Sequence, residues 1–325
     1  MKIIVIGLGS MGKRRIRLIS ENKEVELFGI DSQESRCAEV KDKFSITCYN
    51  SIDEACKAQN IDAAIISTSP LSHASIIKEC LEHNLHVFTE INLVQDGYDE
   101  NISLAKSKGK VLFLSSTFLY RKETQTIIEK VHEAKCPLNY IYHVGQYLPD
   151  WHPWEDYNNY FIGNKRTNGC REILAIDLPW IVSAFGDIIE VKVSKSKNTT
   201  LNIDYNDSYL ILLEHKTGAR GCFAVDVVAR KPFRHMDIYG ESFQLSWGGT
   251  SDSLIVYDIA NKSDNVIDIQ NSSEHVEGYA KFITENQYRE ELNAFLRKIN
   301  DPSFVPHWTF EQDKKVLDWI DIIES

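Results

Sequence analysis

The sequence predicts an α/β domain followed by an α+β domain: an N-terminal doubly wound parallel sheet, then an open-faced, mostly antiparallel sheet. The chain has 325 residues, which is longer than a single hydrophobic core usually grows. Up to about residue 117, short apolar runs alternate with amphipathic segments, as in parallel strands joined by helices. Beyond that point, apolar and polar residues alternate singly, as in antiparallel strands with one solvated face. We therefore expect two domains, residues 1–118 and 119–325.

The strands expected in the first domain are continuous runs of Val, Ile, Leu and Phe, which are typical of strands buried on both faces. They are residues 3–7, 25–31, 63–67, 86–89 and 111–115. Between them, apolar residues recur with helical spacing in residues 11–19, 34–44, 73–82 and 98–108. This alternation indicates a parallel sheet with helices on both faces.

The second domain begins with a predicted helix, residues 122–134, and continues with strands that alternate apolar and polar residues. Turns such as Lys216-Thr217-Gly218 separate the strands. Helical spacing appears at residues 170–185 and 288–299, and a last amphipathic segment, 311–323, is expected to pack back against the body. The expected strands are residues 138–148, 188–195, 208–216, 219–228, 235–245 and 253–259.

Composition excludes several classes of partner. A net charge of -11 argues against nucleic acids and anionic membranes, whose phosphates require a basic face. The longest apolar runs are shorter than the roughly 20 residues that cross a bilayer, and residues 1–6 are predicted to be a strand rather than a signal peptide. The seven cysteines form no Cys-x-x-Cys pair and no cluster has metal-ligand spacing, so we expect neither disulfides nor a metal. A reducing, cytoplasmic location fits this pattern.

The loop Gly7-Leu8-Gly9-Ser10-Met11-Gly12 joins the first predicted strand to the first predicted helix. In this setting, Gly-x-Gly-x-x-Gly is the phosphate-binding fingerprint of Rossmann domains that bind dinucleotides. Gly7 allows the tight turn, and Gly12 lets helix and strand pack closely. Gly9 lets the backbone approach the pyrophosphate, and Ser10 and Met11 open the helix whose N-terminus attracts the phosphate charge. The sequence therefore predicts a dinucleotide site at this loop.

Asp31 ends the second strand, about 20 residues beyond the glycine loop. Its carboxylate is expected to accept hydrogen bonds from the adenosine ribose hydroxyls and to repel a 2'-phosphate. Arg36 offers the alternative, a cation for a 2'-phosphate, although a solvated helix residue is the simpler interpretation. We therefore expect NAD, rather than NADP, as the cofactor.

Four stretches carry a family resemblance: residues 3–12, residues 65–70 with His73, residues 86–90 and residues 169–186. They resemble the Gfo/Idh/MocA family, which includes glucose-fructose oxidoreductase and inositol dehydrogenase, and the resemblance extends over nearly the whole chain. That family pairs a Rossmann domain with an open-faced sheet domain, with the active site between them, and its members form dimers or tetramers sheet against sheet. The resemblance implies a homodimer or homotetramer. It also implies that five residues line the cofactor near its nicotinamide: Thr68, Ser69, Pro70, His73 and Glu90.

Two positions depart from the family pattern. Family dehydrogenases usually follow the strand-end glutamate with a lysine that moves the substrate proton, whereas this chain has Ile91. They also carry an aspartate and, four residues later, a histidine on the helix that starts near residue 169. Counting back from the end of this helix places Glu172 and Ile176 there, and counting forward from its start places Ile173 and Asp177. We favour the first register, because a gap is easier in a loop than within a helix. Glu172 and Asp177 are the catalytic candidates.

Residues 146–157 form a segment dense in aromatic and hydrogen-bonding side chains, including Trp151 and His152. Aromatic faces with polar partners suit a sugar ring, which stacks its C–H face and needs partners for its hydroxyls. A loop that packs its own aromatic residues is the alternative. His152 is a candidate substrate residue or, more simply, a packed loop histidine.

Three further residues are candidates for binding the substrate. Arg171 adjoins Glu172 and is suited to a carboxylate or phosphate group. Tyr120 and Arg121 begin the second domain, where related proteins have a polar pair near the substrate. Together with the aromatic segment, these residues predict a small, carbohydrate-type substrate.

The sequence thus predicts an NAD(H)-dependent oxidoreductase that acts on a sugar or sugar-acid derivative with non-standard acid/base residues. Two alternatives stay open. One is a regulatory or other non-catalytic protein that keeps the dinucleotide site without turnover. The other is a lyase, hydrolase or epimerase in which tightly bound NAD is reduced and reoxidised within each cycle.

Overall fold

The computed structural model describes residues 1–151, 155–269 and 285–325. The chain divides into two compact units, residues 1–117 with 287–315, and residues 118–286 with 316–325. The expected boundary after residue 118 lies one residue from this division, but residues 287–315 group with the first unit rather than the second. Among the described residues, no helix is long and apolar enough to cross a membrane.

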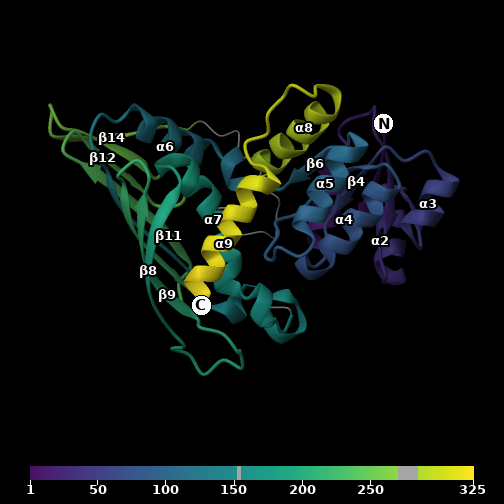
Figure 1. Cartoon of the computed structure of the whole chain (residues 1–325), viewed down its shortest axis with the longest axis horizontal. Coiled ribbons are helices and arrows are strands. Elements are labelled where there is room, and N and C mark those ends of the chain that lie inside the picture. Colours follow the sequence, from purple (N-terminus) through teal and green to yellow (C-terminus); the bar gives the residue numbers. More distant parts are fainter. Residues whose placement is uncertain (152–154, 270–284) are drawn as a thin grey trace. The chain divides into compact units, whose positions relative to one another are not determined.

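The first unit contains a six-stranded parallel sheet in the order β3-β2-β1-β4-β5-β6 (Figure 1). This order confirms the predicted doubly wound sheet. The direction of winding reverses between β1 and β4, and ligands of such sheets bind outside the carboxyl ends of the strands at this point. The elements are β1 Lys2–Ile6, α1 Ser10–Ile19, β2 Glu26–Ile30, α2 Glu34–Phe44, β3 Thr47–Tyr49, α3 Ile52–Ala58, β4 Ala63–Ile66, α4 His73–Glu82, β5 His86–Thr89, α5 Tyr98–Lys108, β6 Leu112–Leu114 and α8 Asn286–Asn300.

Burial explains which elements the sequence predicted. Residues 3–5 of β1 and residues 63–66 of β4 are completely buried, so their continuous apolar runs mark the centre of the sheet. The short elements β3 and α3 were not expected. β3 has three residues at the sheet edge, none of them buried, and α3 has seven, with Ser51 Oγ accepting from Glu54 N at its N-terminus. Elements this short carry little periodicity.

The second unit contains an eight-stranded sheet in the order β14-β13-β12-β11-β7-β10-β9-β8, antiparallel except between β7 and β10. Helices α6 and α7 lie on one face of this sheet (Figure 1). Along β9, buried and exposed residues alternate, so the other face is open. The predicted open-faced sheet is confirmed. The elements are α6 Lys122–Glu133, β7 Asn139–Gly145, α7 Gly169–Phe185, β8 Ile188–Ser196, β9 Ser208–His215, β10 Arg220–Asp226, β11 Phe233–Gly240, β12 Phe243–Trp247, β13 Leu254–Asp258 and β14 Ser263–Val266; α9 Phe310–Glu324 begins in the first unit and ends in the second.

The single strand expected over residues 235–245 was wrong, because this segment forms the hairpin of β11 and β12. Gly240 pairs with Phe243, so Glu241 and Ser242 make the turn. A Cβ at Gly240 would lie 2.7 Å from Cys136 Sγ, which explains the glycine. Strand β14 was also missed, since its four residues are exposed and have no apolar alternation.

Candidate functional site

The glycine loop lies at the carboxyl edge of the parallel sheet, between β1 and α1. Gly7 has φ +89°, in the left-handed region that favours glycine, and its amide donates to Ile30 O at 2.8 Å. A Cβ at Gly12 would lie 1.9 Å from Gly7 O, so only glycine allows this approach. By contrast, the nearest described atom to a Cβ at Gly9 would be Arg36 Nη1, at 3.9 Å. The backbone at Gly9 is therefore open to a ligand.

The N-terminus of α1 fits a phosphate group. Gly9 is the N-cap residue and has no side chain with which to cap the helix, and the first turn, Ser10-Met11-Gly12-Lys13, contains no acidic residue. Backbone N–H groups and the positive end of the helix dipole attract an anion at such a terminus. The loop thus has the open backbone and the local charge that a dinucleotide pyrophosphate requires.

Asp31 follows β2 and is held beside the glycine loop. Its Oδ2 accepts from Leu8 N at 2.7 Å, and its Oδ1 accepts from Gln33 N at 2.8 Å. Arg36 reaches back from α2, so that Nη1 lies 3.5 Å from Asp31 Oδ2. The Arg36 guanidinium therefore lies beside the site, although its side chain is still 43% exposed. The carboxylate expected to bind the ribose is fixed by two backbone amides before any ligand arrives.

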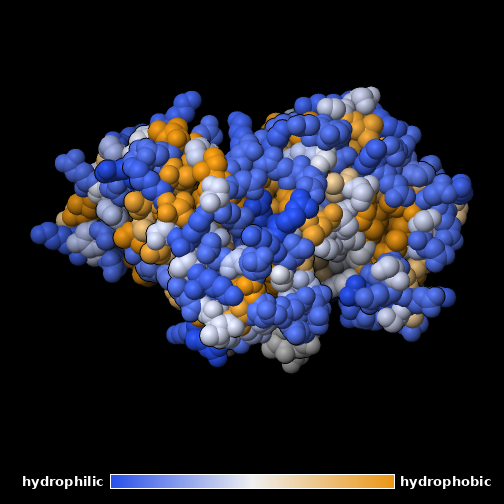
Figure 2. Space-filling view, turned by 60° about the horizontal axis from the view of Figure 1, so that its bottom comes forward, coloured by the Kyte–Doolittle hydropathy of each residue, from blue (hydrophilic) through white to orange (hydrophobic). Residues whose placement is uncertain are grey.

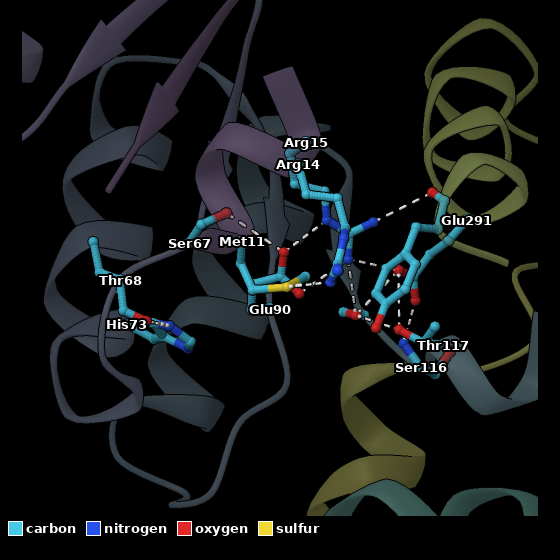
Figure 3. A network of polar contacts seen from close by, with 12 residues as sticks. Met11, Arg14, Arg15, Ser67, Thr68, His73, Glu90, Ser116, Thr117 and Glu291 are labelled. Atoms are coloured by element: carbon cyan, nitrogen blue, oxygen red, sulfur yellow. Dashed lines mark hydrogen bonds and ion pairs between the residues drawn. The ribbon is translucent and has the colours of Figure 1, made fainter. Parts of the chain in front are cut away.

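Thr68, Ser69 and Pro70 follow β4 and lead into α4. His73 begins α4 and is buried, and this burial lowers its pKa. His73 Nε2 donates to the carbonyl oxygen of Thr68 at 3.1 Å (Figure 3). His73 Nδ1 lies 2.8 Å from Asn92 Oδ1. The histidine thus fixes the turn expected to line the nicotinamide, rather than presenting its own ring.

Glu90 follows β5 and is bound by a buried arginine that the sequence analysis missed. Arg15 of α1 donates from Nε and Nη2 to the two carboxylate oxygens of Glu90, at 2.7 and 2.9 Å. Its Nη2 also donates to Glu291 Oε2 at 2.8 Å, and Glu291 accepts from Ser116 N at 2.5 Å (Figure 3). A signal was present in the sequence: Arg15 lies one turn beyond Gly12 on the apolar side of α1, where a cation requires buried partners.

Ile91, the residue that the resemblance aligns with the family lysine, lies between two hydrogen-bonded neighbours. Glu90, before it, is bound by Arg15. Asn92, after it, donates from Nδ2 to Tyr98 OH at 3.0 Å, and Tyr98 OH donates to Asp313 Oδ2 at 2.5 Å. Burial raises the pKa of Asp313 to about 6, although hydrogen bonds from Tyr98 and Trp308 favour its ionised form. Hydrogen-bonded residues thus flank Ile91 on both sides, at the position that the resemblance aligns with the family lysine.

Glu172 lies in the first turn of α7, in the second unit. It is half-buried, and burial raises the pKa of its carboxyl to about 7. Within the part of the chain that the structure describes, no hydrogen bond to this carboxylate is found. Ile176 is also half-buried and lies one turn further along, whereas Ile173 and Asp177 are 6% and 0% exposed. This difference in exposure favours the register that aligns Glu172 and Ile176 with the family aspartate and histidine.

Asp177 is enclosed by donors and has no exposed surface. Its Oδ1 accepts from Tyr142 OH at 2.7 Å, from Trp180 Nε1 at 2.8 Å and from Arg234 Nη1. Arg234 lies 4.4 Å from the centroid of the Phe118 ring. A carboxylate held in this way orients the arginine and packs the helix onto the sheet, so we assign it a structural role. Arg234, on an alternating strand, gave no sequence signal of its partner.

The two arginines expected to bind substrate are both buried in ion pairs. Arg171 donates from Nη2 to Asp321 at 2.6 Å and from Nη1 to Glu324. Arg121 donates to Glu123 at 2.7 Å. Neither guanidinium is presented to a ligand as the sequence suggested. Both charges are already compensated within the second unit.

The other residues expected to bind substrate are placed differently. Tyr120 is buried, with 7% of its surface exposed. Trp151 is half-buried and donates from Nε1 to Gln146 O at 3.0 Å. His152 lies outside the described residues. The aromatic segment therefore offers Trp151 as its best defined candidate.

Residues 1–116 match the Gfo/Idh/MocA model, described as an oxidoreductase family with an NAD-binding Rossmann fold. The chain is 21% identical over 327 residues to myo-inositol 2-dehydrogenase of Thermotoga maritima, covering 92% of this chain and 88% of that protein. Its fold is similar to that of UDP-N-acetylglucosamine 3-dehydrogenase from Acidithiobacillus ferrooxidans, with a TM-score of 0.79, 17% identity and coverage of 100% and 96% of the two chains. It is also similar to an oxidoreductase from Agrobacterium radiobacter in complex with NAD+, L-tartaric acid and magnesium, with a TM-score of 0.82, 14% identity and coverage of 99% and 94%. Residues 1–116 thus form an NAD-binding Rossmann domain.

Proposed function

We propose that this chain, a member of the Gfo/Idh/MocA family of NAD-binding oxidoreductases, catalyses hydride transfer at a hydroxyl-bearing carbon of a sugar or sugar-acid derivative. The observation that carries this proposal is the half-buried carboxyl of Glu172, whose pKa is about 7, on the helix where the family has an active-site acid. NAD, which the glycine loop and Asp31 would hold, would supply the acceptor or donor of the hydride. Glu172 exchanges the hydroxyl proton with the substrate.

Glu172 serves both directions of this reaction. In oxidation, the substrate C–H bond breaks to give hydride, its O–H bond breaks to give a proton, and a C=O bond forms. The ionised Glu172 accepts that proton, and in reduction the protonated carboxyl returns it. Because its pKa is about 7, both forms are populated at neutral pH. The family lysine and histidine, replaced by Ile91 and Ile176, are then not required.

The carbohydrate-type substrate is supported by two observations. The similar proteins include, by name, an inositol dehydrogenase and a UDP-sugar dehydrogenase. Between β7 and α7, Trp151 and Tyr157 are half-buried, so part of each aromatic surface stays accessible. Such surfaces stack on the C–H face of a sugar ring.

The test is an assay of NADH formation with the full chain. Inositols, hexoses, sugar 1-phosphates, nucleotide sugars and nonulosonate-type acids form the panel. We expect at least one to reduce NAD, and Glu172→Gln to lower kcat by about 10²- to 10⁴-fold. Glu129→Gln, an exposed glutamate on α6, is the matched control and keeps its rate. Full activity of Glu172→Gln would sink the proposed role of Glu172.

A second candidate function is a lyase, hydrolase or epimerase reaction in which NAD is reduced and reoxidised within one cycle. Ile91 and Ile176 favour it, because an isoleucine cannot transfer the proton that the usual lysine and histidine transfer in an ordinary dehydrogenase. The same assay separates it from the first. Product without net NADH supports this second candidate, whereas binding of sugars without any product supports a non-catalytic protein.

We further propose that the open face of the second sheet pairs with a second copy of the chain, giving a homodimer or homotetramer. Large apolar side chains are exposed on three strands of this sheet: Phe233 on β11, Ile141 on β7, and Leu210 and Leu212 on β9. Hydrophobic residues reach the surface in patches between hydrophilic ones (Figure 2). Light scattering is expected to give an oligomer that Leu212→Arg dissociates; a wild-type monomer at micromolar concentration would contradict this.

The cysteines support a cytoplasmic location, which we propose for this protein. All seven are free thiols in the structure. Free thiols persist in reducing compartments.

A further inference from the structure

We propose that Asp321 and Glu324, near the end of α9, are positioning residues for Glu172 and act through Arg171. This inference rests on the proposed catalytic role of Glu172. It gives Arg171 a part other than binding the substrate.

The contacts form a closed circuit around the first turn of α7. Asn168, the N-cap residue, accepts from Arg171 N through Oδ1 at 2.8 Å and donates from Nδ2 to Glu324 Oε1 at 2.7 Å. The Arg171 guanidinium donates to Asp321 Oδ1 at 2.6 Å and to Glu324 Oε2. Lys195 of β8 donates to the Glu324 carbonyl at 2.8 Å. Hydrogen bonds from Asn168 and Arg171 to the carboxylates of α9 therefore hold the first turn of α7 in place. Glu172 belongs to this turn.

The same circuit controls the charge beside Glu172. Arg171 precedes Glu172 in the chain, and an uncompensated guanidinium there would favour the ionised carboxyl. Two carboxylates compensate it, and Glu172 keeps the pKa of about 7 that burial produces. We call Asp321, Glu324 and Arg171 the clamp. Tyr160 interacts electrostatically with Glu172. The titratable groups that interact with Arg171 or Glu324 include Cys170, Lys195 and Tyr209. Groups that interact in turn with these include Glu155, Tyr157, Tyr205, Asp207 and Asp226.

Opposite substitutions in the clamp are expected to move the pKa of Glu172 in opposite directions. Glu324→Gln leaves the Arg171 charge partly uncompensated, so the pKa of Glu172 falls by about one unit. Arg171→Gln leaves two carboxylates without their cation, so the pKa rises by about the same amount. If the clamp had only a structural role, both variants would lower Tm, but they would not shift the pKa of Glu172 in opposite directions.

The pKa is measured by NMR titration of 13C-labelled glutamate carboxyl groups in the full chain, with Glu172→Gln identifying the signal. This readout needs no turnover, so opposite shifts support the clamp even if the proposed reaction fails. Unchanged or parallel shifts in folded variants overturn it. Asp321→Asn removes the more exposed carboxylate, 57% exposed, and is the milder variant if Glu324→Gln does not fold.

Glu129→Gln is the matched control in this titration, because it removes an exposed glutamate of the same unit. It is expected to leave the Glu172 signal unchanged. Where a substrate is found, the low-pH limb of kcat/KM is expected to follow the NMR value in each clamp variant. Glu324→Asp, which keeps the charge, is expected to restore the wild-type limb.

Discussion

In the first unit, the Glu90 carboxylate is bound through both oxygens by the buried Arg15, which it shares with Glu291. In the second unit, Glu172 is half-buried without such a partner among the described residues, and burial raises its pKa to about 7. The two carboxylates are thus buried in different ways. The Arg15 guanidinium compensates the charge of Glu90, whereas burial without a cation favours the neutral form of Glu172 and makes proton exchange possible near neutral pH.

This difference separates two tasks. Arg15 ties together α1, β5 and α8, so the helix that begins at the glycine loop is held by charges that need not change during a reaction. Glu172 lies in a turn where the neighbouring charge, Arg171, is compensated by other carboxylates. Removal of a charge is therefore expected to destabilise the first unit and to change the chemistry of the second.

The largest effect is expected for Arg15→Met. It leaves the buried Glu291 and the 13% exposed Glu90 without their cation, so the free energy of unfolding falls by about 3–5 kcal/mol. The control is Lys13→Met on the same helix. The ion pair of Lys13 with Glu39 is partly exposed, so its loss is expected to lower the free energy of unfolding by about 1 kcal/mol or less. Urea unfolding measures both. Equal losses of unfolding free energy in the two variants would mean that the buried ion pairs of Arg15 stabilise the fold no more than an exposed pair does.

A smaller effect is expected at Asp31, a carboxylate held by backbone amides. The wild type is expected to bind NAD more tightly than NADP, by on the order of tenfold or more, because a 2'-phosphate would meet this charge. Asp31→Ser removes the preference and Asp42→Ser, exposed on α2, does not. Calorimetric titration with both cofactors decides. Equal or better binding of NADP to the wild type would mean that Arg36 outweighs Asp31.

A pH-dependent effect on stability is expected at Asp313, a desolvated carboxyl in the first unit. Its pKa is raised from 3.8 in the unfolded chain to about 6, so the folded state binds the proton more tightly. The stability from this group is therefore full at low pH and lost as pH rises through about 6. Tm of the wild type is expected to fall relative to Asp313→Asn between about pH 4 and pH 6. The exposed Glu100→Gln keeps the wild-type profile, and a profile of the opposite sign in the wild type would contradict the desolvation of Asp313.

Local patterns predicted the parts of the site that are local in sequence. The glycine loop, Asp31 and the first turn of α7 each lie where a strand ends or a helix begins, and periodicity locates such points. The ion pairs were missed because their partners are distant: Arg15 meets Glu291, and Arg171 meets Glu324. Nothing near Arg171 in the sequence shows that its guanidinium turns toward α9.

The errors in the fold have two causes. Apolar residues stand at even positions in β11, as at Met236 and Ile238, and at odd positions in β12, as at Phe243 and Leu245, and the prediction of a single strand overlooked this change at the turn. Residues 287–315 group with the first unit through contacts such as the Arg15–Glu291 pair, which periodicity does not report.

The central claim is that Glu172 is the group that exchanges the substrate proton. The most direct test is the pH dependence of kcat/KM for NAD-linked oxidation, comparing the wild type, Glu172→Gln and the control Glu129→Gln. In the wild type and the control, the rate is expected to rise with pH through about 7, where Glu172 loses its proton. Glu172→Gln is expected to lose this limb while binding NAD as the wild type does. A limb near pH 7 that persists in Glu172→Gln would contradict the account, because another group would then be titrating.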